Sequence, residues 1–456
     1  MAAATTALPT RGALLAAAAT LLALIPMALW IGQAPLHLPI LAIVATVLFA
    51  ATLLHAEAGL LILVASMLLS PELALGAAGS GGLERSRDLI LRTEDLVLLL
   101  VGFAWMARMA IHKDLGAVRR TRLNGLIAAY AACCLFSTLI GIQAGRVRPL
   151  VGLCYVAKSV EYFFIFFITI NYVRTADQLR RLLYAVLLIA SGIVAYAFWQ
   201  IPTGQRPSAP FEGGIGEPNT LGGYLVLMFA VACGVSLTAE TPRLRRLTGL
   251  LAGAIVPALI ATLSRSSWLA FGAAMLVLLA LSRNRGRLAA VTIVALVVLF
   301  LAMPHRVQQR IDYTFTPEGA DAVHLGRLHL DASSSARLNS WGAALNGFLR
   351  HPLTGWGITG YGFLDAQYFR VLVELGAPGF AAFALLLVGC GLLFGSAYHT
   401  LADPLQRGLA LGMLAGFAGL LAHAIGTNTF LLIRIMEPFW LLTGLLVAAM
   451  SLRDGT

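Results

Sequence analysis

Apolar stretches long enough to cross a membrane recur along the whole chain, and short polar segments separate them. Each stretch has about 18 or more residues, which is the length a helix needs to cross a hydrocarbon core of roughly 30 Å. Lipid offers no hydrogen-bond partners, so every backbone N–H and C=O must be paired within the protein, as a helix does. The pattern predicts an all-α, polytopic transmembrane helical bundle, organised as one integral membrane domain over residues 1–456.

The length rule predicts about 12 to 14 spans. They lie near residues 13–32, 37–54, 57–70, 91–111, 123–142, 150–173, 180–200, 218–238, 244–263, 266–282, 288–303, 372–397, 405–425 and 430–450. The third span is short, and the ninth and tenth are nearly fused around Arg265.

The composition supports a membrane protein and argues against a disulfide-rich protein and a protein with a structural metal site. Hydrophobic residues make up 59% of the chain and charged residues only 12%, whereas soluble domains average roughly 25% charged residues. The five cysteines all fall inside apolar runs and lack metal-ligand spacing. We therefore expect neither a disulfide framework nor a metal site, and we expect no cofactor.

The net charge of +11 comes from basic residues in short loops. With 14 crossings, the basic clusters within 112–122, 174–181, 243–246 and 283–287 all fall on one side, together with both termini. The positive-inside rule makes that side the cytoplasm of a bacterial inner membrane. This placement accounts for the charge without a nucleic-acid partner. The periplasmic side then holds residues 201–217, the Arg265 turn and a long loop over 304–364.

The long loop ends in a segment with helical periodicity. From 336 to 350, apolar residues such as Leu338, Trp341 and Leu345 recur at spacings of three and four. That spacing predicts an amphipathic helix lying on the membrane or over a cavity, and a lid over that cavity is the corresponding hypothesis.

Two arginines on the expected periplasmic side are candidates for holding phosphate. Arg265 stands at the tip of a tight turn between two apolar runs, and Arg206 lies in the 201–217 loop. A guanidinium grips phosphate through paired N–H donors, although a snorkelling interfacial arginine explains Arg265 as well. Asn219 opens the next span after Pro218, and a bare helix N-terminus also attracts anions. Ordinary turn chemistry is the alternative for this loop.

Two further groups are candidate bases. Asp365 stands at the outer mouth of a span, where beside Arg265 it would stay ionised and accept a proton from a sugar hydroxyl. A helix N-cap is the equally good alternative. His351 is either a base or an interfacial polar residue.

Two pairs of charged residues fall inside predicted spans. Lys158 with Glu161 and Arg434 with Glu437 are each spaced for an internal ion pair. A proton or ion pathway is the alternative interpretation.

Four motifs occur in an order that resembles the O-antigen ligase and polysaccharide polymerase superfamily. They are Glu217-Pro-Asn219, Ser264-Arg-Ser-Ser-Trp268, Arg337 through His351-Pro-Leu-Thr-Gly-Trp-Gly357, and Tyr368 through Glu374-Leu-Gly376. The resemblance covers residues from about 200 to 380. It implies a GT-C-like membrane glycosyltransferase that needs neither a metal nor a nucleotide sugar. It also implies a glycan donor on undecaprenyl pyrophosphate and, as acceptor, another lipid-linked glycan or the lipid A core.

The resemblance also implies roles for individual residues. Arg206, Arg265 and Arg337 correspond to pyrophosphate-binding arginines, and Arg265 and Asp365 to catalytic groups. Asn219, His351, Tyr368 and Glu374 are supporting candidates. Ligases of this superfamily typically carry a His-Asn pair before the tyrosine of the fourth motif, and Asp365 stands in that position here. We interpret this departure as favouring O-antigen or exopolysaccharide polymerisation over ligation to lipid A.

Other membrane functions remain as alternatives at this point. A secondary transporter of a small anion such as bicarbonate would account for the spans, and a cell-wall polymerase would use the same lipid carrier. The single long outer loop and the lack of a visible internal repeat argue against a transporter.

Overall fold

The computed structural model describes residues 37–69, 72–74, 90–111, 119–211, 216–282, 324–325, 328–329, 332–362 and 364–454, with 286 and 288. The predicted span 13–32 lies outside these residues, as do 288–303 apart from residue 288, and so do the first residues of the long loop.

Helices occupy nearly all of the described chain. They are α2 (His37–Leu54), α3 (Ala56–Leu69), α4 (Thr93–Ile111), α5 (Asn124–Gln143), α6 (Pro149–Tyr172), α7 (Ala176–Gln200), α8 (Pro218–Thr238), α9 (Pro242–Ala261), α10 (Arg265–Leu281), α13 (Ala332–Arg350), α14 (Gln367–Thr400), α15 (Pro404–His423) and α16 (Ile433–Asp454). Short 3-10 turns η2 (Ile201–Thr203) and η3 (Thr429–Leu431) join them. The strands β1 (Glu72–Ala74) and β2 (Ile90–Arg92) form one antiparallel pair, and β3 (His324–Leu325) and β4 (Leu328–His329) another.

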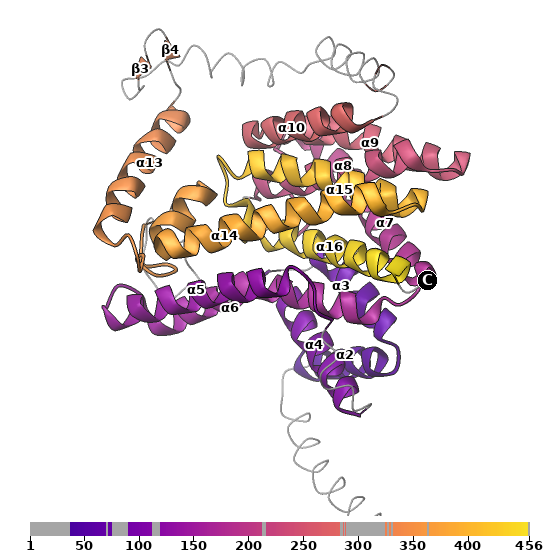
Figure 1. Ribbon diagram of the computed structural model, residues 1–456, viewed down its shortest axis with the longest axis horizontal. Coiled ribbons are helices and arrows are strands. Elements are labelled where there is room, and N and C mark those ends of the chain that lie inside the picture. The colour runs from indigo at the N-terminus through magenta and orange to yellow at the C-terminus, as the bar shows by residue number, and fades with distance from the viewer. Residues whose placement is uncertain are drawn as a thin grey trace, which may run out of the picture.

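The helices confirm the predicted polytopic bundle. In the described part of the chain, eight helices are long and apolar enough to cross a membrane, and each coincides with a predicted span. Three shorter apolar helical segments, within α2, α3 and α10, also fall on predicted spans. Figure 1 shows the bundle helices running side by side, with α13 crosswise to them at the end where α14 begins.

The loops gather at the two ends of the bundle as an alternating topology requires. At one end, Arg453 at the close of α16 donates to the carbonyl of Thr400 at the close of α14. Tyr398 of α14 donates there to Leu281 of α10. The opposite end holds the described residues of the 201–217 segment, the turn between α9 and α10, and the α15–α16 connection (Figure 1). Two of these segments, 201–217 and the turn at Arg265, are ones that the sequence expects on the same side.

Helix α8 is the buried centre of the bundle, and it packs against α15 through glycines. Gly408, Gly412 and Gly416 fall at four-residue spacing on α15. A Cβ on Gly412 would lie 2.5 Å from the Cα of Val231, and one on Gly408 would lie 2.8 Å from the Cα of Val235. Only residues without a side chain let two backbones come this close, a packing mode common between membrane helices.

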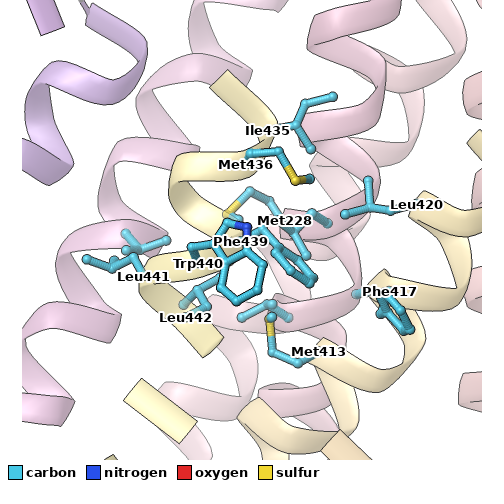
Figure 2. Packing of buried hydrophobic residues seen from close by; sticks show 14 of the residues in the cluster. Met228, Met413, Phe417, Leu420, Ile435, Met436, Phe439, Trp440, Leu441 and Leu442 are labelled. Atoms are coloured by element: carbon cyan, nitrogen blue, oxygen red, sulfur yellow. The ribbon is translucent and has the colours of Figure 1, made fainter. Parts of the chain in front are cut away.

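Aromatic and sulfur-containing side chains fill the space beside this contact. Figure 2 shows Phe439 and Trp440 of α16 among Met228 of α8 and Phe417 of α15. The Phe417 and Phe439 rings are inclined by 29° to each other, with centroids 6.0 Å apart. All four side chains are at least 95% buried, so α8, α15 and α16 form one packed frame from which the loops of the site extend.

Candidate functional site

Three arginines that lie far apart in the sequence line one small cavity. The cavity has a volume of about 200 Å³ and is lined by Arg206, Asn219, Leu263, Ser264, Arg265, Ser266 and Arg337. It lies at the end of the bundle where α8 and α10 begin. We call it the arginine cavity. The structure therefore brings together the three arginines that the superfamily resemblance associates with pyrophosphate.

The turn that presents Arg265 has a constrained backbone. Leu263 adopts a positive φ of 53°, a conformation that is uncommon for a residue with a side chain. Ser264 then caps α10, because its side chain accepts a hydrogen bond from the backbone N–H of Ser267. Arg265 is the first residue of α10. The Arg265 side chain therefore extends from the N-terminal end of α10, where the helix dipole also favours a bound anion.

The other two arginines reach the cavity from different elements. Arg206, in the segment after η2, donates from Nε to the carbonyl oxygen of Thr262 over 2.8 Å. Arg337 extends from α13, and its Nη2 lies 3.8 Å from a carboxylate oxygen of Asp365. The cavity therefore combines a loop, a helix start and the crosswise helix.

A buried network of polar side chains packs beneath the arginine cavity and holds the turn that carries Arg265. The Ser267 hydroxyl donates to the Ser264 hydroxyl over 2.7 Å and lies 3.1 Å from Nε2 of His423. Nδ1 of the same ring lies 2.8 Å from the hydroxyl oxygen of Thr429. His423 is completely buried. Sequence reasoning missed this histidine because it stands at the end of an apolar run with no motif around it.

A second, larger cavity adjoins the first and is lined by carboxylates. It has a volume of about 460 Å³, and we call it the carboxylate cavity. Three acidic side chains, Glu217, Asp365 and Glu374, and two basic ones, Lys158 and Arg370, line it. Its other lining residues are Tyr130, Tyr155, Ser159, Gly216, Pro218, Asn219, Thr220, Ile358, Val371, Leu375, Thr427, Asn428, Leu431, Leu432 and Ile433. Asn219 lines both cavities, so it marks their junction.

Asp365 lies between the two cavities. It lines the carboxylate cavity and forms the ion pair with Arg337 of the arginine cavity. Burial raises the pKa of the Asp365 carboxyl, and the Glu217 charge adds to that rise, whereas the Arg337 charge opposes it. The N-cap alternative is wrong, because Ala366 occupies the N-cap position of α14.

Glu374 is held inside the protein by two donors. Its carboxylate accepts from the backbone N–H of Thr359 over 3.2 Å and from Nε of Arg370 over 3.3 Å. Its side chain is only 7% exposed. Glu374 therefore lines the carboxylate cavity with a fixed orientation.

The Gly355-Trp-Gly357 motif and the Glu374-Leu-Gly376 motif form one structural unit. The N–H of Trp356 donates to the carbonyl of Val373, and that of Gly357 to the carbonyl of Glu374. Gly376 has a φ of 70° and interrupts α14, which explains why glycine is required there. These glycines thus allow the α13–α14 loop to bond through its backbone to α14 at the kink of that helix.

Two of the supporting candidates point to other partners. Nε2 of His351 lies 2.8 Å from Nη1 of Arg146, at the turn between α5 and α6. Burial together with the charges of Arg146 and Arg350 lowers the pKa of His351. The hydroxyl of Tyr368 donates to the carbonyl of Leu421 on α15 over 2.7 Å. These contacts give both residues packing roles.

The intramembrane charges have partners that the sequence reading did not include. Nζ of Lys158 lies 3.1 Å from a carboxylate oxygen of Asp95 at the start of α4. Arg434 is completely buried and donates to the carbonyl of Pro210 over 2.8 Å. Among the described residues, no cluster of three or more histidine, cysteine or acidic side chains could hold a metal ion.

The comparison with protein families adds to this geometry. Residues 250–384 match the O-antigen ligase family. The match confirms the superfamily resemblance and indicates a multi-pass membrane protein of the O-antigen ligase and polymerase type, which transfers glycosyl groups. None of the curated proteins compared with the chain matches it. The O-antigen ligase match covers Arg265, Arg337 and Asp365, whereas Arg206 and Asn219 precede it.

Proposed function

We propose that this protein is a glycosyltransferase of the bacterial inner membrane that polymerises a glycan carried on undecaprenyl pyrophosphate, on the periplasmic side. The observation that supports it is the convergence of Arg206, Arg265 and Arg337 in one cavity, with Asp365 beside them. Three guanidinium groups line this cavity of about 200 Å³ and none of its lining residues is acidic, so the cavity favours an anion. A pyrophosphate carries several negative charges and offers oxygens for paired N–H donors.

The reaction follows from this arrangement. Asp365, when ionised, accepts the proton of an acceptor-sugar hydroxyl. The hydroxyl oxygen forms a bond to the anomeric carbon of the donor as the bond from that carbon to the pyrophosphate oxygen breaks. The lipid pyrophosphate leaves as an anion, and the arginines stabilise its developing charge. No metal is required by this scheme, because the guanidinium groups supply the positive charge.

The distribution of charge supports the periplasmic orientation. The C-terminus lies at the bundle end opposite to the one where α14 begins (Figure 1). The basic segments around Arg119 and Arg174 adjoin the close of α6, and that around Arg243 opens α9, so these segments lie away from the end where α8 and α10 begin. The positive-inside rule assigns the end that carries these basic segments to the cytoplasm. The lipid-linked donor and its acceptor, a second lipid-linked glycan, then meet at the periplasmic surface. We infer polymerisation rather than ligation to lipid A because Asp365 occupies the position where ligases carry histidine.

The test is the length of surface polysaccharide in cells that lack this gene and are complemented with wild type, Arg265→Lys or Asp365→Asn. We expect deletion to leave single repeat units and only the wild type to restore long chains. Arg245→Lys, at the opposite bundle end, is the matched control and should restore them too. Membrane levels of each variant are compared by immunoblot.

Each other outcome has a definite meaning. Long chains that accumulate on undecaprenyl pyrophosphate after deletion would show a ligase with lipid A core as acceptor. Unchanged surface glycans would refute the glycosyltransferase proposal and direct attention to anion transport. Chain extension by the purified protein that stops when EDTA is added would refute the metal-independent scheme.

A further inference from the structure

The carboxylate cavity contains polar atoms that the described part of the protein leaves unsatisfied. Oγ1 of Thr427 and Oδ1 of Asn428 are buried and have no hydrogen-bond partner among the described residues. Both side chains line the cavity, and the two residues are only 5% and 7% exposed. Leaving such a group unpaired costs about 1–3 kcal/mol. Two adjacent unpaired oxygens beside one cavity indicate a ligand that brings hydrogen-bond donors.

The charges around the cavity restrict what that ligand is. Arg370 is paired with Glu374 and Lys158 with Asp95, so both basic groups are already neutralised by the protein. Asp365 is itself paired with Arg337 of the arginine cavity, and Glu217 is the third carboxylate, so acidic side chains outnumber basic ones in the lining by three to two. A ligand with its own carboxylate or phosphate would be repelled here, whereas hydroxyl, acetamido and ammonium groups would be accepted.

The cavity also offers an apolar surface and enough room for a sugar. The rings of Tyr130 and Tyr155 and the side chains of Ile358, Val371 and Leu375 line it together with the polar groups. Its volume of about 460 Å³ lies within the range of roughly 300–1,000 Å³ that is usual for small-molecule sites. A sugar ring combines a hydrogen-bonding edge with an apolar face, which matches both parts of the lining.

We propose that the carboxylate cavity is the acceptor site and that it selects a neutral or amino sugar over an acidic one. The proposal rests on the proposed function, because it is the position of Asp365 between the cavities that makes this sugar the acceptor. A sugar in the carboxylate cavity presents its hydroxyl to Asp365 from the side opposite the arginines. The donor's pyrophosphate occupies the arginine cavity, so the new bond forms at the junction marked by Asn219.

The test is saturation-transfer difference NMR on the purified full-length protein in lipid nanodiscs. The probes are N-acetylglucosamine, glucosamine and glucuronate, each alone. We expect clear saturation transfer to the first two probes. The signal for glucuronate should be at least about fivefold weaker, the factor to which about 1 kcal/mol of charge repulsion corresponds. Asn428→Leu and Thr427→Val should each weaken the signal of the first two probes by about the same factor.

Thr443→Val is the matched control, because the Thr443 hydroxyl is buried and bonded within α16 to the carbonyl of Phe439. It should bind all probes as wild type does. Thermal unfolding in the nanodisc checks each variant, and Glu217→Gln replaces any variant that does not fold. Equal binding of glucuronate, or unchanged binding by folded Asn428→Leu and Thr427→Val, would overturn the proposal.

A phosphorus NMR titration with inorganic pyrophosphate separates this proposal from the one on which it rests. Binding of pyrophosphate that Arg265→Lys weakens, without any sugar binding, would refute the acceptor site alone. Sugar binding without pyrophosphate binding would support a sugar site but refute the proposed polymerase.

Discussion

The ion pair between Arg337 and Asp365 predicts a measurable change in the pH dependence of transfer. Transfer requires the ionised Asp365, so its rate falls as pH drops through the pKa of that carboxyl. Arg337 lowers this pKa. Arg337→Met should therefore raise the pKa further and move the acid limb of the profile to higher pH.

The size of the shift follows from the distance. Two unit charges separated by the observed 3.8 Å attract by about 1 kcal/mol in water and about 4 kcal/mol at an effective dielectric constant of 20. The two side chains are 29% and 33% exposed, which favours the weaker value. One pKa unit corresponds to about 1.4 kcal/mol, so we expect a shift of roughly one unit.

The assay is glycan extension by the purified protein with a lipid-pyrophosphate oligosaccharide, measured as kcat/KM between about pH 4 and pH 8, which reports the free enzyme's groups. Arg206→Met is the matched control. Arg206 lines the same cavity but bonds the Thr262 carbonyl, so its loss should lower kcat/KM while leaving the acid limb in place. An acid limb that stays fixed or moves to lower pH in Arg337→Met would refute the assignment of Asp365 as the base.

Two further predictions concern stability. The pKa of His351 is lowered in the folded protein, so its neutral ring is favoured there; this contribution to stability is full above the ordinary pKa of about 6.5 and declines as pH falls through the lowered value. Between pH 8 and pH 5.5, the unfolding temperature should therefore fall less for His351→Gln than for wild type. An equal fall in the two proteins would contradict the Arg146 contact. Gly412→Val would force a side chain against the Val231 backbone, an overpacking that costs about 1–3 kcal/mol or more; we expect a lower unfolding temperature than for Gly395→Val, where a Cβ meets nothing within 4 Å.

The spans were predictable because apolar length alone specifies a membrane helix. The same pattern gave the alternation of loops between the two ends, since each crossing reverses the direction of the chain. The pairing of α8 with α15 was not predicted. The four-residue spacing of Gly408, Gly412 and Gly416 was visible in the sequence and indicated a close contact, but spacing does not name the partner helix.

The site was predictable in its residue types and less so in its contacts. Arg206, Arg265 and Arg337 were selected as outward-facing cations, yet only the fold places them around one cavity. Asp365 was expected beside Arg265, whereas the structure places Arg337 beside it. Thr427 and Asn428 were overlooked because a short polar connection between two spans resembles any other turn. Their significance depends on unsatisfied oxygens, a property of the packed structure.

The crosswise position of α13 has a consequence for binding thermodynamics. Arg206 and Arg265 are fixed by the bundle, but Arg337 is contributed by a helix that lies outside it (Figure 1). A ring stack between Trp341 and Phe369 attaches α13 to α14. Binding of an anion that bridges all three arginines is therefore coupled to the packing of α13 against the bundle. Anion binding stabilises that packing, and the packing raises anion affinity by the same free energy. Weakening the stack of Trp341 on Phe369 should therefore lower the affinity for the anion, although neither ring lines the arginine cavity.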